Sequence, residues 1–450
     1  MTSLRIALVG ALLLISCVQD RPYRLQGEAH GVYDRKFPGQ QQPSETREIN
    51  GRSYDISFVE FDDKGDFWDR SQLKIAAGKI KDAPKPVLLV VFIHGWHHNA
   101  ADRPRPTKNP GDVETFNCLL SKLAASSTTR DLHVHGVYLG WRGRLMQGWP
   151  DYLTFLGRKA TATRVAGTPV TETIFELIRQ ARRKGPNTSK AVVIGHSFGA
   201  LVLEKAMAQA YAGSVLLQDA QSEGGAFNAP ADLVLLVNSA AESIYAKELE
   251  DMFRAVGHRS HIRPEQPLFV SITAETDSGT KTWFPFGTFL PNLFARRHYD
   301  WVGRGPTSDN VSQNEYLTTT PGHNKRLFTH TIASIGPTPS RNATPPDLDA
   351  CGREDRAFEQ NLVNPKGMQF RTTNPARPDE FEWWRFKPVP EAPRSKEPRK
   401  PTPYWVVQVP PTIIDGHTPI FTPEGCAMMA ALYTISNPEE GPRQLRLKAQ

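Results

Sequence analysis

One short stretch constrains this chain more than any other: AVVIGHSFGA, residues 191–200. The four apolar residues that open it predict a buried β-strand, and ALVLEKAMAQAYAG (200–213) predicts a helix. A serine at a sharp strand-to-helix turn has a strained backbone and needs small neighbours, and Gly195 and Gly199 flank Ser197 where side chains would clash. The dipole of the following helix favours negative charge that develops beside the turn. We therefore interpret Ser197 as a nucleophile rather than a residue of an ordinary turn.

Apolar runs alternate with helical patterns along most of the chain. The predicted strands are 54–61, 86–95, 131–141, 191–195, 232–240, 267–275 and 405–410, and the predicted helices are 113–126, 170–184 and 200–213. This alternation predicts an α/β fold with a mostly parallel sheet, and right-handed crossovers would place helices on both faces. The first run, YDISFVEF, alternates apolar and polar residues as an edge strand does.

Composition changes mark the boundaries of the predicted α/β domain, which spans residues 51–436. A small cap is expected at about 142–168, and a long insertion at about 280–403 precedes the last strand. The insertion is rich in proline from Pro337 onward, and PVPEAPRSKEPRKPTP (388–403) excludes a helix or a central strand. Residues 437–450 are interpreted as a C-terminal tail.

The first 17 residues, MTSLRIALVGALLLISC, have the composition of an export signal. The apolar stretch from Ile6 to Ile15 follows Arg5 and is too short to span a bilayer as a helix. Leu-Ile-Ser-Cys at its end resembles a bacterial lipobox, in which the cysteine, here Cys17, is lipidated. A plain signal peptide or an N-terminal anchor is the alternative. We expect an exported protein held by a lipid at the cell envelope, with residues 18–50 as a polar tether.

Cysteines and charge limit the other classes of function. Three cysteines follow Cys17, so at most one bridge forms among Cys118, Cys351 and Cys426. The favoured pair is Cys351–Cys426, with Cys118 as a buried thiol. No Cys/His cluster has the spacing of metal ligands, so we expect neither a metal nor a cofactor. The net charge is +7 without a run of Lys and Arg, which argues against nucleic-acid binding.

The motifs GHSFG (195–199) and HGWHHN (94–99) make most of residues 52–436 resemble the α/β-hydrolase family. The resemblance implies an eight-stranded, mostly parallel sheet. It also implies hydrolysis of an ester-like bond by a serine, an acid and a histidine, in that chain order. The intermediate of such a reaction needs two N–H donors to hold its oxyanion. We expect them to be the backbone groups of Phe198, directly after the serine, and Trp96, directly after the strand that ends in His94-Gly95. His94 is expected to shape this loop through a hydrogen bond.

The acid and the base are expected after later strands. Asp277 follows an apolar strand and precedes a Ser-Gly turn, and it resembles the family's acid; Glu275 is the alternative. His417 follows the last predicted strand in the turn-forming sequence Asp-Gly-His. His323 and His330 lie inside the insertion and are interpreted as packing or pocket residues.

These parts predict a serine esterase or lipase that forms an acyl-enzyme on Ser197 and acts on a small-molecule or lipid ester. Aromatic residues near the carboxyl ends of the strands would line an apolar acyl pocket or simply pack the core: Trp96, Tyr138, Trp141, Trp149, Phe155, Trp283 and Phe286. Arg142 and Arg144 would meet an anionic group or lie in solvent. Acyl transfer to another acceptor, and an inactive lipoprotein that binds a partner, are the alternative functions.

Overall fold

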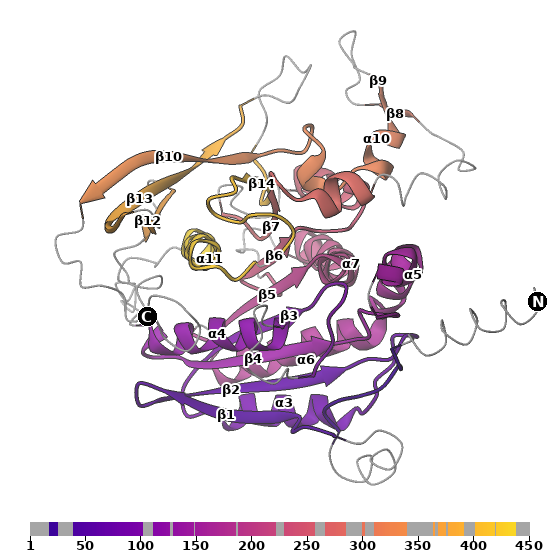
Figure 1. The fold of residues 1–450 in the computed structure, drawn as a ribbon, viewed down its shortest axis with the longest axis vertical. Helices are drawn as coiled ribbons and strands as arrows, with labels where there is room; N and C mark the ends of the chain where they lie inside the picture. The colour runs from indigo at the N-terminus through magenta and orange to yellow at the C-terminus, as the bar shows by residue number, and fades with distance from the viewer. Residues whose placement is uncertain are drawn as a thin grey trace, which may run out of the picture.

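The structure of the protein is a computed structural model. It describes residues 18–25, 39–101, 111–126, 129–147, 149–185, 188–221, 229–256, 266–284, 299–301, 310–339, 363–364, 368–374, 377–390, 401–418 and 420–437. Within these ranges, twelve strands form one mixed sheet, and a separate pair is made by β8 (Tyr299–Trp301) and β9 (Asn310–Ser312) (Figure 1).

The order of strands across the large sheet is β1-β2-β4-β3-β5-β6-β7-β14-β10-β13-β12-β11. Neighbours from β2 to β10 pair in parallel, whereas β1, β13, β12 and β11 pair antiparallel. The bounds are β1 (Ser44–Ile49), β2 (Arg52–Glu60), β3 (Val87–Ile93), β4 (His133–Gly140), β5 (Lys190–His196), β6 (Leu233–Val237), β7 (Phe269–Ala274), β10 (His330–Pro339), β11 (Val363–Asn364), β12 (Gln369–Asn374), β13 (Arg377–Pro388) and β14 (Tyr404–Val409).

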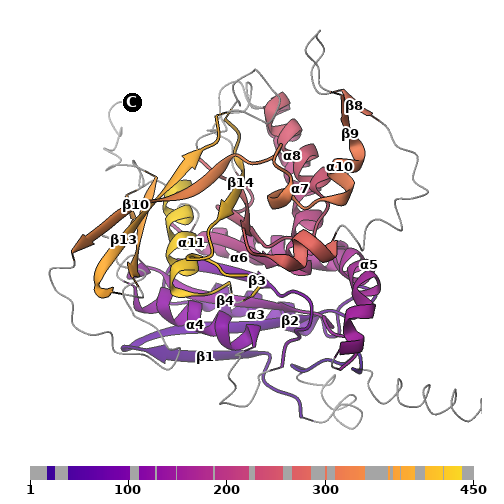
Figure 2. The ribbon, with the colours of Figure 1, turned by 45° about the horizontal axis from the view of Figure 1, so that its top comes forward.

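Helices cover both faces of this sheet, as Figure 2 shows. On one face lie α3 (Ser71–Asp82), α5 (Phe155–Val165), α6 (Thr168–Lys184), α7 (Phe198–Gln221) and α8 (Ser243–Val256), and on the other lie α4 (Asp112–Ala125) and α11 (Pro423–Ser436). Strand β3 is apolar throughout because both of its faces are buried. Leu89 and Val91 face one helical layer, and Val90 and Phe92 face the other. Every residue of β3 is buried.

The N-terminal part differs from the predicted tether. Residues 44–49 form β1, which pairs antiparallel with β2, so β2 is not the edge strand that its alternation predicts. The backbone N–H groups of Tyr23 and Arg24 donate to the buried carboxylate of Glu60 at 2.9 and 2.8 Å, which holds residues 18–25 against the fold. Residues 44–49 were predicted as part of the tether because an edge strand, with much of its surface in solvent, has the same polar composition as a linker.

Part of the expected insertion extends the sheet. β10 lies parallel to β14, and β13 and β12 follow it in antiparallel pairing. The eight strands implied by the family resemblance are therefore too few for this chain. Residues 391–400, in the proline-rich stretch, lie outside the described residues, and so do 1–17 and 438–450, so the interpretations of these segments stay predictions.

The cysteine predictions were wrong. Cys118 is disulfide-bonded, and Cys426, predicted to pair with Cys351, is a buried thiol. Cys351 and Cys17 lie outside the described residues. Tertiary contacts decide which cysteines meet, and a helical pattern around Cys118 carries no information about them. No helix in the described part of the chain is both long and apolar enough to cross a bilayer.

Candidate active site

Ser197 lies at a strained turn between β5 and α7. Its φ is 55°, in the left-handed region that side chains rarely adopt. The turn is tight on both sides: a Cβ added to Gly195 would lie 2.7 Å from Ala200 Cα, and one added to Gly199 would lie 2.1 Å from the Ile93 carbonyl oxygen. The Ser197 N–H donates to Val237 O on β6 at 3.0 Å, which fixes the turn against the neighbouring strand. Only glycine fits at both flanking positions.

The side chains of Ser197, His417 and Asp277 form one hydrogen-bonded row. His417 Nε2 lies 2.8 Å from Ser197 Oγ, and His417 Nδ1 lies 2.9 Å from Asp277 Oδ1. These distances place an imidazole between a hydroxyl and a carboxylate, although the three residues are separated by 80 and 140 positions in the chain (277 − 197 and 417 − 277). Glu275, the alternative acid, is exposed and takes no part in the row.

Asp277 is fully buried, and polar groups surround its carboxylate. The backbone N–H of Thr280 donates to Oδ1 at 3.1 Å, and the Thr280 hydroxyl donates to Oδ2 at 2.6 Å. Burial alone would raise the pKa of Asp277, but the hydrogen bonds and charge of His417, together with those from Thr280, lower it below the ordinary value of 3.8. Asp277 is therefore ionised at neutral pH and favours a proton on the facing nitrogen of His417.

A second histidine extends this network. Because the Thr280 hydroxyl donates its hydrogen bond to Asp277, it accepts a hydrogen bond from His323 Nε2, which lies 3.0 Å away. Thr280 belongs to a π-helical turn (Gly279–Trp283) after β7, and His323 ends a short helix (Pro321–His323) inside the predicted insertion. Burial lowers the pKa of His323. The prediction that His323 packs or lines a pocket missed this contact, since no local pattern connects the two residues.

The backbone of His417 is also held in place. His196 Nε2 donates to the His417 carbonyl at 2.9 Å, and Asn238 Nδ2 donates to the same oxygen at 3.0 Å. Burial, with the charge of His417 nearby, lowers the pKa of His196 to about 4, so its ring is a neutral donor. Gly416, with φ at 73°, allows the turn that presents His417. Neither His196 nor Asn238 was predicted, although His196 is the residue directly before the serine.

The loop after β3 passes directly over the serine. A Cβ added to Gly95 would lie 2.7 Å from Ser197 Cβ. Phe198 is the first residue of α7, and among the described residues no acceptor for its N–H or for that of Trp96 is found. Helix N-termini leave such donors unpaired. The backbone N–H groups of Trp96, directly after Gly95, and of Phe198, directly after Ser197, are therefore both without an acceptor among the described residues.

His94 shapes this loop as expected. Its Nδ1–H donates to Gly95 O at 2.8 Å, and its Nε2 accepts from the Trp141 N–H at 3.0 Å. Burial lowers the pKa of His94 to about 4, in agreement with a neutral ring in one tautomer. His97 lies 3.1 Å from Asp151 and His98 lies 3.6 Å from Asp112, so the three histidines have separate partners. The described residues contain no group of three or more side chains that is able to hold a metal ion.

Aromatic side chains form one wall beside the serine. The rings of Trp96 and Phe155 have centroids 5.5 Å apart, and Phe155 lies 5.1 Å from Phe198. Tyr138 and Trp141, also expected as pocket residues, are buried against His94 instead. The side chains of Trp149, Trp283 and Phe286 lie outside the described part.

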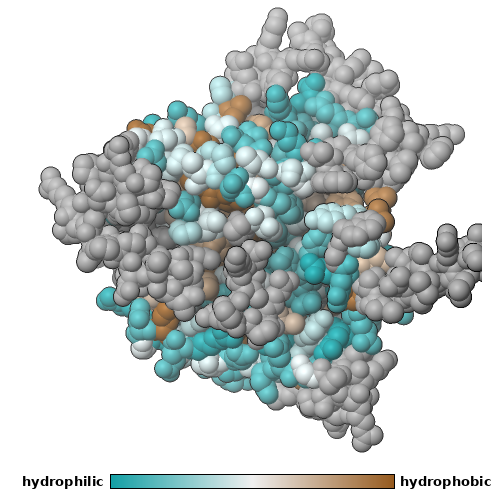
Figure 3. All heavy atoms as spheres, in the orientation of Figure 1, coloured by the Kyte–Doolittle hydropathy of each residue, from teal (hydrophilic) through white to brown (hydrophobic). Residues whose placement is uncertain are grey.

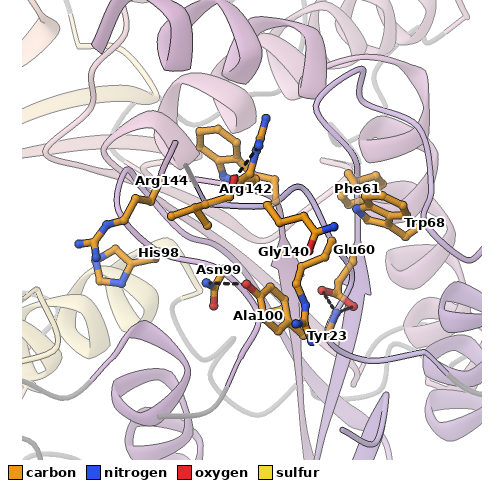
Figure 4. Close-up of a pocket in the computed structure, with 14 residues that line it drawn as sticks. Tyr23, Glu60, Phe61, Trp68, His98, Asn99, Ala100, Gly140, Arg142 and Arg144 are labelled. Carbon is orange, nitrogen blue, oxygen red and sulfur yellow. Dashed lines mark hydrogen bonds between the residues drawn. The ribbon is translucent and has the colours of Figure 1, made fainter. Parts of the chain in front are cut away.

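A separate pocket lies between the N-terminal segment and the end of β4 (Figure 4). Tyr23, His98 and Arg144 are among the residues that line it, and none of the three residues of the hydrogen-bonded row does. Arg142, at its rim, contacts Asp63 and donates to Val18 O at 2.8 Å, so it holds the N-terminal segment rather than standing in solvent.

Comparison with known proteins gives weak likenesses. No protein-family model matches the chain, and no curated protein matches it. Among solved structures, Est1E from Butyrivibrio proteoclasticus is 11% identical, with a TM-score of 0.22 over 52% of this chain and 79% of that one. Phospholipase PlaB from Legionella pneumophila is 10% identical, with a TM-score of 0.26 over 72% of this chain and 93% of that one. At these TM-scores the likeness says nothing about the chemistry of this chain.

Proposed function

We propose that this protein is a serine hydrolase that cleaves an ester bond through Ser197, His417 and Asp277. The observation that carries the proposal is the pair of distances at His417, with Nε2 at 2.8 Å from the serine hydroxyl and Nδ1 at 2.9 Å from the buried carboxylate. An isolated serine is a weak nucleophile, and an adjacent oriented base is what activates it. The strained turn and these two backbone N–H groups, of Trp96 and Phe198, support the same function.

The proposed reaction has two halves. His417 accepts the hydroxyl proton as Ser197 Oγ forms a bond to the acyl carbon, and the protonated imidazole then gives that proton to the departing alcohol as the ester bond breaks. In the second half, His417 accepts a proton from water as the water oxygen bonds to the acyl carbon, and it returns that proton to Ser197 Oγ as the acyl-enzyme bond breaks and the carboxylic acid leaves. Asp277 holds His417 in one tautomer and stabilises its charged form. The N–H groups of Trp96 and Phe198 hold the oxyanion in each half.

The proposed substrate is an ester with an apolar acyl group. The aromatic wall of Trp96, Phe155 and Phe198 beside the serine is suited to a hydrocarbon chain and offers no charged group to an ionic one. The proposed location is the cell envelope, with Cys17 lipidated after export. This location rests on the sequence of residues 1–17.

Labelling with a fluorophosphonate probe tests the proposed function. The probe reacts with activated serines, so we expect the wild-type protein to be modified at Ser197 and the Ser197→Ala and His417→Ala variants to stay unmodified. A panel of p-nitrophenyl esters of increasing chain length then measures the acyl preference. If the folded wild-type protein is not labelled and hydrolyses none of the esters, the proposed function is wrong.

A further inference from the structure

The segment predicted as a cap, about 142–168, carries a group of exposed apolar side chains. Tyr152, Leu153 and Leu156 are 56%, 78% and 41% exposed, and they lie within five residues at the junction of η2 (Trp149–Thr154) and α5. We name these three residues the cap patch. Figure 3 shows hydrophobic surface at the edge of the molecule where α5 lies in Figure 1. The other large apolar side chains that are exposed in the described part, Leu217 and Ile335, belong to separate elements.

The cap patch is continuous with the wall beside the serine. Tyr152 packs edge-on against Trp96, with ring centroids 5.6 Å apart, and Trp96 lies 6.1 Å from Phe198. Phe155 fills the space between Trp96 and Phe198 from the same cap. Packed aromatic rings thus connect the exposed patch to Phe198, which is buried next to Ser197, and Ser197 itself is 4% exposed.

The start of the described chain is fixed close to this patch. The Val18 N–H donates to Leu145 O at 2.7 Å. Leu145 and Met146 in turn donate their N–H groups to Asp151 Oδ1, at 3.0 and 2.9 Å, and Asp151 directly precedes the patch. Val18, the first described residue, therefore lies on the side of the molecule where the cap patch lies, and a lipid on Cys17, as proposed above, would be attached directly before it.

We propose that the cap patch docks on a lipid bilayer and turns Ser197 and the aromatic residues beside it toward the membrane. This inference rests on the proposed function for its substrate, an ester drawn from the bilayer. A single lipid anchor leaves a protein free to turn on the membrane, and a second, apolar contact fixes its orientation. The exposed leucines of the cap patch, on the side of the molecule where Val18 lies, supply that contact, and clustered apolar surface of this kind marks interaction sites.

Fluorescence quenching in vesicles tests the docking. The full chain carrying Leu153→Cys is labelled with bimane and reconstituted in phosphatidylethanolamine–phosphatidylglycerol vesicles whose acyl chains are brominated. We expect the bromines to quench residue 153 roughly twofold or more, because its side chain enters the acyl region. The matched control is Leu217→Cys, which is 64% exposed but lies about 28 Å along α7 from Phe198 and should not be quenched. Labelled wild-type protein gives the background.

Two results would overturn the docking proposal. One is equal quenching at residues 153 and 217. The other is burial of the label at 153 without vesicles and in proportion to protein concentration, which would assign the patch to a second copy of the chain. The quenching of the label at residue 153 is also measured in Ser197→Ala protein, because docking does not require catalysis. Docking in a protein that the fluorophosphonate never labels would therefore refute the proposed function and leave the docking intact.

Rates on two substrates provide an independent test. Replacing both leucines of the patch (Leu153→Ser with Leu156→Ser) should slow hydrolysis of a long-chain p-nitrophenyl ester dissolved in vesicles by roughly tenfold or more, since two apolar contacts with the bilayer are lost. Hydrolysis of soluble p-nitrophenyl acetate should stay near the wild-type rate, which shows that the variant is folded. Leu217→Ser should change neither rate. Wild-type rates of the double variant on both substrates would contradict the docking.

Discussion

At the scale of single residues, the candidate active site is organised around the carboxylate of Asp277, which has no exposure to solvent. Both oxygens of Asp277 accept hydrogen bonds, one of them shared with His417, and the pKa of the group is lowered despite burial. A buried charge that is fully hydrogen-bonded is stable, whereas the loss of one partner leaves an unsatisfied acceptor. The contacts of this side chain therefore affect both stability and the orientation of His417.

Asp277→Asn should lower kcat by about 10³–10⁴-fold, because an amide favours the wrong tautomer of the histidine it faces. The rate is measured with a soluble p-nitrophenyl ester, and near-UV circular dichroism checks the fold. Glu275→Gln is the matched control, since this exposed carboxyl lies on the same loop, and it should keep the wild-type rate. A reversal of the two results would give Glu275 the role of the acid.

Thr280 and His323 act through Asp277, so we regard them as positioning residues. Thr280→Val removes the hydroxyl that donates to Asp277 Oδ2 and should lower kcat roughly 10–100-fold with little change in KM. Thr280→Ser keeps the hydroxyl and should restore most of the rate. If both variants melt at a lower temperature but keep the wild-type kcat, the contact is structural only.

At the scale of elements, the sharp junction of β5 and α7 depends on the absence of two side chains. Gly199 lies where α7 passes closest to the end of β3, and any Cβ there would overlap the Ile93 carbonyl. Backbone atoms at this point are tied into the sheet and are not able to move apart without breaking its pairing. The position of the serine is therefore set by how closely a helix packs against strands.

Gly199→Ala should lower the melting temperature and abolish fluorophosphonate labelling, because the added methyl displaces the turn. Gly213 offers a control on the same helix, since nothing lies within 4 Å of a Cβ built there. Gly213→Ala should raise the free energy of unfolding by about 0.5–1 kcal/mol, as expected for alanine in a helix, and should leave labelling unchanged. Equal behaviour of the two variants would argue against the steric explanation.

At the scale of the whole molecule, β14 joins the sheet after a long excursion of the chain and brings His417 to the serine. Tyr404 at the start of β14 donates to the buried carboxyl of Glu204 on α7 at 2.9 Å, which connects two elements 200 residues apart. Burial raises the pKa of Glu204 from 4.5 to about 8. The folded protein thus holds a proton on Glu204 at neutral pH, while the unfolded chain does not.

This proton gives stability a defined pH dependence. The group binds a proton more tightly in the folded state, so its contribution to the free energy of unfolding falls as pH rises from 4.5 to about 8 and is constant above that. Glu204→Gln removes the titration. Urea unfolding at pH 5 and pH 9 should show the variant gaining stability relative to the wild type at the higher pH. A difference that does not change with pH would show that Glu204 is ionised in the folded protein.

Local patterns in the sequence carried a large part of the fold and of the candidate site. The apolar runs that became β3, β5 and β7, and the strand-turn-helix at Ser197, are identifiable because burial and turn geometry act on neighbouring residues. Asp277 and His417 follow strand ends in turn-forming sequences, and in the structure His417 lies between Ser197 and Asp277 in one hydrogen-bonded row.

Tertiary structure alone decided the rest. The pairing of β1 with β2, the disulfide at Cys118 and the contact of His323 with Thr280 each join segments with no shared local pattern. The position of Val18 beside the cap is of the same kind, since it depends on a hydrogen bond to a residue more than 100 positions away (145 − 18). Such contacts depend on how the whole chain packs, and the pattern of residues that are neighbours in the sequence does not predict that packing.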